Sequence, residues 1–118
     1  MLSTKRVYAP ASPEDGTRFL VDRLWPRGLT KADVQAAKWL KALAPSDALR
    51  RSFGHDADQW PAFLERYWAE LDQQPEAIAE IRQALRLGSV TLLYAARDEE
   101  RNNAVALKAY LERFPDAE

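Results

Sequence analysis

Several residue types are scarce or absent from this sequence, and each absence excludes a class of chemistry. Cysteine is missing altogether, so disulfide bridges, thiolate nucleophiles and thiolate-bound metals are excluded. His55 is the single histidine, and no repeated His or Glu-x-x-His spacing supports a zinc site. The four glycines occur singly, so there is no glycine-rich motif of the kind that cradles phosphate.

Long hydrophobic runs are also missing. No apolar run approaches the roughly 18 residues of a membrane-spanning helix. Residues 1–6 lack the apolar core of a secretory signal. We therefore expect a cytoplasmic protein that does not cross a membrane.

The chain has no strong excess of either charge. It contains 17 basic and 18 acidic side chains in 118 residues, which gives a formal net charge of −1. No global field therefore draws it to nucleic acid or to an acidic membrane, and any basic site has to be local. The length fits one compact domain.

Hydrophobic patterning predicts strands that alternate with helices. Strands are predicted at residues 5–8, 18–24, 39–43 and 90–95. Helices are predicted at residues 31–37, 47–53, 58–71, 75–87 and 99–114. Residues 39–43 could also continue the preceding helix, because periodicity does not decide so short a run. The strands at 18–24 and 90–95 each run into a polar turn and a helix, which favours an α/β fold.

The connection between the first two strands limits how they can pair. Residues 9–16 are mostly turn formers and are fewer than the dozen or so that a parallel crossover needs. The first two strands are therefore either antiparallel or not neighbours.

Capping residues and an apolar stripe mark the helices. Thr30 with Asp33 resembles a capping box, Ser46 is a candidate N-cap, and Gly54 should end the second helix. The clearest stripe has the spacing of one helix face and comprises Trp60, Phe63, Leu64, Tyr67, Trp68 and Leu71. These aromatic residues are interpreted as core. The inner face of the last helix is predicted to comprise Ala104, Leu107, Leu111 and Phe114.

Polar residues gather after the two apolar strands. Asp22, Arg23, Trp25 and Arg27 follow the strand at 18–24. The strand at 90–95 is followed by Arg97, Asp98, Asn102 and Asn103. Ligands of open α/β sheets collect outside the carboxyl ends of the strands, and arginine forks favour phosphate or carboxylate. We therefore expect these eight residues to hold an anionic small molecule.

Each of these residues also has a structural interpretation. Asp22 and Arg23 could form an ion pair, and Trp25 could anchor its loop instead of stacking on a ligand ring. Asp98 fits the N-cap of the last helix. Asparagine is a poor helix former, so Asn102 and Asn103 need polar partners.

His55 and Asp56 lie together in a loop and form a candidate acid–base pair. Histidine exchanges protons near neutrality, and Asp56 could orient it or could simply start the turn. A metal held by His55, Asp56 and Asp58 has weak support from their spacing, so we predict no metal site. No nucleophile-elbow signature supports a Ser-His-Asp triad.

Several motifs together resemble a known family. The most specific are the blocks at residues 21–28 (VDRLWPRG) and 53–56 (FGHD). Further matches are the residues at 5–8, 39–41, 44–46, 49–50, 60, 63, 66–67, 70–71, 90–98 and 103. Together they resemble the YeaO-like branch of the bacterial family called domain of unknown function 488. The resemblance implies a small, single-domain, cytoplasmic α/β protein with a mainly parallel sheet of about four strands flanked by helices, and no settled activity.

Other branches of that family are similar in layout but carry cysteine and histidine near the last strand. This chain has Ala96, Arg97 and Asp98 there, so thiol or metal chemistry is not carried over. The leading hypothesis is a pocket that binds an anionic, nucleotide-like small molecule. Hydrolysis or group transfer is the reaction class left open, with Asp22, His55 and Asp56 as the catalytic candidates. The alternative is a non-enzymatic adaptor that binds nucleic acid or a protein through a Trp25/Arg27 surface.

Overall fold

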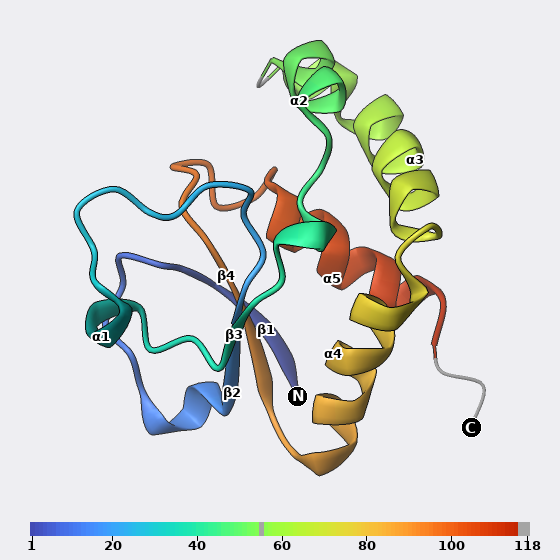
Figure 1. Ribbon diagram of the computed structural model, residues 1–118. Helices are drawn as coiled ribbons and strands as arrows, with labels where there is room; N and C mark the ends of the chain where they lie inside the picture. Colours follow the sequence, from blue (N-terminus) through green and yellow to red (C-terminus); the bar gives the residue numbers. More distant parts are fainter. Residues whose placement is uncertain (55, 116–118) are drawn as a thin grey trace.

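Four short strands form one parallel sheet in the computed structural model, which describes residues 1–54 and 56–115. They are β1 (Leu2–Arg6), β2 (Thr17–Leu20), β3 (Lys38–Trp39) and β4 (Val90–Tyr94). Their spatial order is β1-β4-β2-β3, and every pairing is parallel (Figure 1). Because β4 lies between β1 and β2, the prediction that the first two strands need not be neighbours is confirmed.

β4 and β2 form the centre of the sheet. Every residue of β4 is buried, and its backbone pairs with β1 on one side and with β2 on the other. This central position agrees with the apolar sequence of both strands. Since all the strands are parallel, their carboxyl ends meet at one edge, where the loops that follow can build a ligand site.

The described part of the chain contains five α-helices. They are α1 (Lys31–Val34), α2 (Asp47–Phe53), α3 (Trp60–Leu71), α4 (Pro75–Leu87) and α5 (Asn103–Arg113). Helices α4 and α5 lie against one face, with α3 packed on α5, and α1 with its flanking loops covers the other face (Figure 1). The fold is α/β, as predicted. In the described part of the chain, no helix has the length and apolarity needed to span a membrane.

Two apolar clusters stabilise the two faces of the sheet. The larger joins β2 and β4 to the long helices and includes Phe19, Leu92, Tyr67, Ile81 and Leu107. The smaller comprises Val7, Leu20, Val34 and Leu93, with both Trp25 and Trp39 packed against it. The loop after β2 is thus tied to the sheet by the smaller core.

Three of the predicted caps are present. The Thr30 hydroxyl accepts a hydrogen bond from Asp33 N–H (3.1 Å) and the Asp33 carboxylate accepts from Thr30 N–H (2.8 Å), which completes a capping box. Ser46 caps α2 through Leu49 N–H (3.2 Å). Gly54 ends that helix with a φ of 53°, in the left-handed region where glycine is favoured. The apolar stripe of residues 60–71 is helix α3.

Two predicted strands are longer than the strands in the structure. β2 ends at Leu20 instead of residue 24, since the next carbonyl, Val21 O, accepts from the Asn103 side chain (3.0 Å). β3 contains only Lys38 and Trp39, because its partner strand stops at Leu20. The chain then forms the 3-10 turn η2 (Lys41–Leu43) in place of the predicted strand at 39–43.

Other boundaries shift for equally local reasons. β1 begins at Leu2 and ends at Arg6, where the prediction was 5–8, because its whole length pairs with buried β4. Helix α1 ends at Val34, since Gln35 adopts a φ of 51° and Ala37 N–H then pairs with Arg18 O (2.7 Å).

The start and end of the last helix were predicted wrongly. Asp98 does not cap α5; its carboxylate accepts from the Glu100 and Arg101 N–H groups (2.9 and 3.0 Å) in a separate turn. Asn102 is the N-cap, through Val105 N–H (2.9 Å). Phe114, predicted to face inward, lies just past the helix and is 45% exposed.

Candidate functional site

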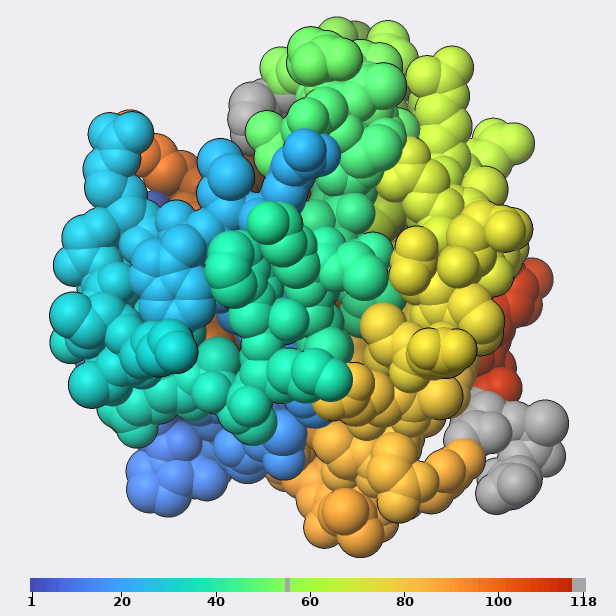
Figure 2. Space-filling view, viewed as in Figure 1, coloured from blue at the N-terminus to red at the C-terminus, as the bar shows by residue number. Residues whose placement is uncertain are grey.

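A cavity of about 550 Å³ opens at the carboxyl ends of β2 and β4. We call it the strand-end pocket. Its lining is Tyr8, residues 22–27, Pro45, Arg50, Arg51, Phe53, Phe63, Ala95, Ala96 and residues 101–103. Figure 2 shows the surface hollowed between the loop after β2, at the upper left, and α2, at the top. The pocket therefore lies where the parallel sheet is expected to place a ligand.

Asp22 connects three walls of this pocket. One carboxylate oxygen accepts from Ala95 N–H (2.8 Å), in the segment after β4. The other accepts from the Asn103 side chain (2.9 Å), at the start of α5. The Asp22 carbonyl accepts from the indole N–H of Trp39 (2.7 Å). Asp22 is thus a scaffold residue that also faces the cavity.

Burial raises the pKa of Asp22 above its ordinary value of 3.8. The hydrogen bonds from Asn103 and from Ala95 N–H oppose this effect, and so does the positive charge of Arg50. A guanidinium therefore acts on the carboxylate across the pocket, although these two described residues form no ion pair. The arrangement leaves a carboxylate and a cation with a gap between them.

The raised pKa of Asp22 predicts a pH dependence of stability. The folded chain holds the proton of the Asp22 carboxyl group more tightly than the unfolded chain does. The stabilisation that results is fully present at a pH below the pKa of the unfolded state. It is lost as the pH rises through the pKa of the folded state. We expect the unfolding free energy of the wild type to fall relative to that of Asp22→Asn over the acidic pH range, as the pH rises above about 4. Urea denaturation of both proteins across this range measures the difference. A constant or rising difference would contradict the prediction.

Arginine dominates the charge of the pocket. Five of the lining residues are arginines: Arg23, Arg27, Arg50, Arg51 and Arg101. The only carboxylate among the described lining residues is Asp22. Since the whole chain has a net charge of −1, positive charge is concentrated here.

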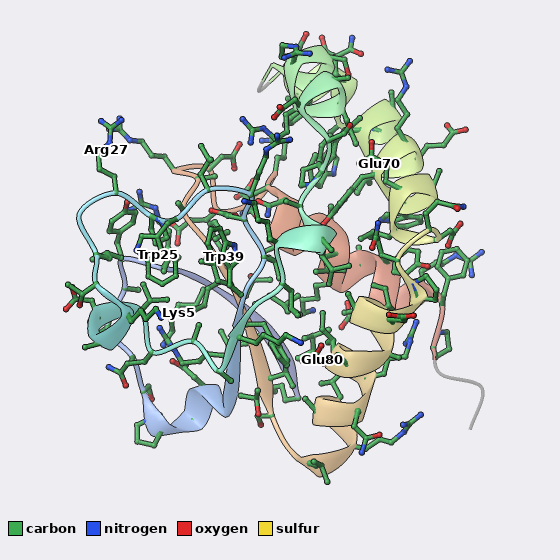
Figure 3. The ribbon with its side chains drawn as sticks, in the orientation of Figure 1. Lys5, Trp25, Arg27, Trp39, Glu70 and Glu80 are labelled. Atoms are coloured by element: carbon green, nitrogen blue, oxygen red, sulfur yellow. The ribbon has the colours of Figure 1, made fainter. Side chains whose placement is uncertain are left out.

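Among the described residues, two of these guanidinium groups lie near a carboxylate and three form no ion pair. Arg23 pairs with Asp47 at 3.0 Å, an exposed bridge from the loop after β2 to the first turn of α2. Arg101 lies 3.9 Å from Asp98, at the limit of an ion pair. Arg27, Arg50 and Arg51 form no ion pair with any other described residue. Figure 3 shows Arg27 extending outward from the tip of its loop.

Trp25 anchors the loop that carries the arginines. Its indole N–H donates to Leu29 O (2.7 Å), and its ring meets the Trp39 ring edge-on at 5.5 Å (Figure 3). The Tyr8 hydroxyl supports the same loop by donating to Arg27 O (3.0 Å). The loop-anchor interpretation of Trp25 is confirmed, and the half-buried ring also lines the pocket.

Arg6 holds the opposite wall. Its guanidinium donates to the carbonyls of Ala96 (3.0 Å) and Ala95 (3.3 Å), which fixes the segment after β4. Asn102, also in this wall, donates to Asp98 O (2.9 Å). The polar partners predicted for Asn102 and Asn103 are therefore present.

Six of the predicted site residues meet in the pocket: Asp22, Arg23, Trp25, Arg27, Asn102 and Asn103. Arg97 and Asp98 are exposed in the loop after β4 and do not line it. Asp56 is exposed and caps the 3-10 turn η3 (Ala57–Gln59) through Asp58 N–H (3.0 Å). His55 lies outside the described residues. Arg23 pairs with Asp47 and not with Asp22, so the expected ion pair between chain neighbours is wrong.

Arg50, Arg51 and Arg101 are the site residues that sequence reasoning missed. Arg50 and Arg51 stand in the last turn of α2, where cations also complement the helix dipole. The sequence feature that could have pointed to Arg50 and Arg51 is that they form an adjacent basic pair shortly before the Phe-Gly-His-Asp block. Among residues 1–54 and 56–115, no group of three or more His, Asp or Glu side chains could hold a metal ion.

Comparisons with known proteins place the chain among uncharacterised relatives. A family model described as the inactive DUF488-N3 subclade matches residues 1–118. The uncharacterized protein YeaO of Escherichia coli (strain K12) is 39% identical over 110 residues, covering 93% of this chain and 96% of its own. An uncharacterized protein of Mycobacterium tuberculosis (strain ATCC 25618 / H37Rv) is 39% identical over 106 residues, covering 90% and 89%. No solved structure matches the chain.

Proposed function

The chain belongs to the inactive DUF488-N3 subclade, and from this premise we propose that its strand-end pocket binds an anionic small molecule without chemically changing it. The observation that carries the proposal is the excess of arginine: five guanidinium groups against one carboxylate in the described lining. Arginine binds phosphate and carboxylate through two parallel hydrogen bonds, which gives both energy and orientation.

The size of the pocket supports a small ligand. Its volume of about 550 Å³ falls within the range of about 300–1,000 Å³ of small-molecule sites. Phe53, Phe63, Pro26 and Pro45 supply apolar surface beside the arginines. An anion that also carries a ring or a short carbon skeleton fits this combination.

Binding without turnover is supported by the scarcity of acid–base groups in the pocket. Hydrogen bonds to both carboxylate oxygens of Asp22 hold that side chain in the scaffold. Apart from the arginines, Asp22 and Tyr8 are the only titratable residues in the described lining, and the Tyr8 hydroxyl donates to Arg27 O. Catalysis by Asp22, His55 or Asp56 stays a prediction, and the description of the subclade as inactive weighs against it.

A titration with pyrophosphate tests the proposal. We expect Arg50→Ala and Arg51→Ala each to weaken binding about tenfold or more, because a hydrogen bond to a charged group contributes about 1.5–3 kcal/mol. Isothermal titration calorimetry at low ionic strength measures the affinities. Arg66→Ala is the matched control, since Arg66 is an exposed arginine on neighbouring α3 outside the lining.

Two results would contradict the proposal. One is an unchanged affinity in both pocket variants, which would place pyrophosphate elsewhere on the surface. The other is the lack of any binding by the wild type at low ionic strength, where attraction between exposed charges is strongest.

The alternative function is a non-enzymatic adaptor for nucleic acid or a protein. It is favoured by the loop after β2, where Leu24 is 67% exposed between arginines. The packing of Trp25 on Trp39 leaves less of its ring for stacking on a base. Salt-sensitive binding of an oligonucleotide, lost in Arg27→Ala, together with no binding of pyrophosphate, would favour the adaptor.

A further inference from the structure

We propose that the ligand is a phosphorylated sugar, either free or within a nucleotide, whose hydroxyl groups donate to Asp22 while its phosphate contacts the arginines. This inference rests on the proposed function and names the class of anion. It starts from the one feature that a site built for a simple anion would not need, a carboxylate inside a pocket of arginines.

The Asp22 carboxylate has acceptor capacity left for a ligand. An ionised carboxylate offers about four lone-pair sites and no donor. In the structure two of these sites are used, one by Ala95 N–H and one by Asn103. Both donors belong to the scaffold, so they hold the carboxylate in place at the edge of the cavity. A ligand must therefore bring its own hydrogen-bond donor to this point.

The donor is best supplied by a neutral hydroxyl. An ammonium group would pair with Asp22, but the five surrounding guanidinium groups would repel it. A second anionic group would be repelled by Asp22 itself. A hydroxyl avoids both penalties, and it can donate to a carboxylate while it accepts from a guanidinium. Arg50 lines the same pocket as Asp22 from the last turn of α2, so its guanidinium can supply that second bond.

The phosphate is expected toward Arg27, Arg50 and Arg51, which form no ion pair with another described residue. Arg27 lies on the loop after β2, whereas Arg50 and Arg51 lie on α2, so residues of two different walls of the pocket carry these positive charges. A dianionic phosphate can accept from both walls, whereas a single carboxylate offers fewer acceptors. The pocket thus has one place that accepts hydroxyl donors and one that donates to an anion, the two ends of a sugar phosphate.

The test compares two esters of equal charge on the wild-type protein. Ribose 5-phosphate carries the hydroxyl groups, and cyclopentylmethyl phosphate has a similar ring without them. By calorimetry we expect ribose 5-phosphate to bind about 10- to 100-fold more tightly, since its hydroxyl groups reach a charged acceptor. The comparison needs no variant, so it does not depend on how a substitution folds.

Variants then assign the effect to Asp22. In Asp22→Asn the preference for ribose 5-phosphate should shrink severalfold or more, whereas pyrophosphate, which has no such hydroxyls, should bind at least as tightly because a negative charge is gone. Glu99→Gln is the matched control: it removes one charge from an exposed site on the loop after β4, outside the lining, and should keep the preference. Circular dichroism verifies that both variants are folded.

The outcomes separate this inference from the proposed function. Equal affinities for the two esters, or binding of pyrophosphate but of neither ester, would overturn sugar recognition and leave anion binding intact. No binding of any of the three would overturn both. Adenosine monophosphate distinguishes the two sources of the sugar. If it binds more tightly than ribose 5-phosphate, the ligand is a nucleotide, and if the two bind equally, the ligand is a free sugar phosphate. Either result supports the proposal.

Discussion

Replacing Arg18 with methionine is expected to lower the free energy of unfolding by about 3–5 kcal/mol, because it breaks a buried ion pair from one side. Arg18 lies in β2 and is 6% exposed. Its guanidinium is 2.6 Å from the Asp15 carboxylate and donates twice to Val34 O (2.7 and 3.3 Å). Methionine fills much of the same volume, so the loss reports on the polar contacts. Chemical denaturation measures it.

A double-mutant cycle supplies the control. Burial raises the pKa of Asp15, but hydrogen bonds from Lys5, Ser12 N–H and Arg18 outweigh it and hold the pKa below its ordinary value. Once Arg18 is gone, Lys5 at 2.7 Å is the remaining cation. Asp15→Asn should therefore cost clearly less in the Arg18→Met background than in the wild type. Additive effects of the two substitutions would show that the pair is not coupled.

Gly16→Ala is the second substitution with a large expected effect, about 3–5 kcal/mol of lost stability. Gly16 precedes β2 and has a φ of 65°, a conformation that side chains disfavour. A Cβ there would lie 2.1 Å from Ser89 O and 2.7 Å from Ser89 C, both backbone atoms that cannot rotate away. That same carbonyl accepts from Thr17 N–H (2.9 Å) where β2 meets β4. The sheet must shift to admit the methyl group.

Gly28→Ala is the control that separates the cost of the steric contact with Ser89 from the cost of the backbone conformation. Gly28 has a φ of 82°, but nothing lies within 4 Å of the position its Cβ would take. We therefore expect only the conformational cost of about 1–2 kcal/mol. Thermal or urea unfolding of both variants measures the difference. Equal losses at Gly16 and Gly28 would mean that the approach of Ser89 contributes nothing.

The sequence predicts well those elements whose signals are local. The capping box of Thr30 and Asp33 and the apolar stripe of α3 depend on residues three or four apart. The end of β2, in contrast, depends on a distant partner. Asn103, the first residue of α5, donates to Val21 O, 82 residues away, and so ends β2. No local pattern shows that bond.

The same distinction holds for the site. Asp22, Arg23 and Arg27 could be placed at a strand end, because carboxyl ends of parallel strands share one edge. Arg50 and Arg51 come from a helix between β3 and α3, and only the tertiary fold brings them across from that loop. The predicted apolar strand included Arg18, which the structure shows as a buried cation. Its partner Val34 O lies in α1, so the local sequence could not reveal this contact. Buried polar pairs of this kind are set by the fold.

Anion binding by the strand-end pocket is tested most directly by a crystal structure of the protein with saturating pyrophosphate. We expect electron density for the anion between the loop after β2 and α2, with phosphate oxygens about 2.7–3.2 Å from guanidinium nitrogens of Arg50, Arg51 or Arg27. Density for pyrophosphate only at other surface positions, with water alone in the pocket, would contradict the account.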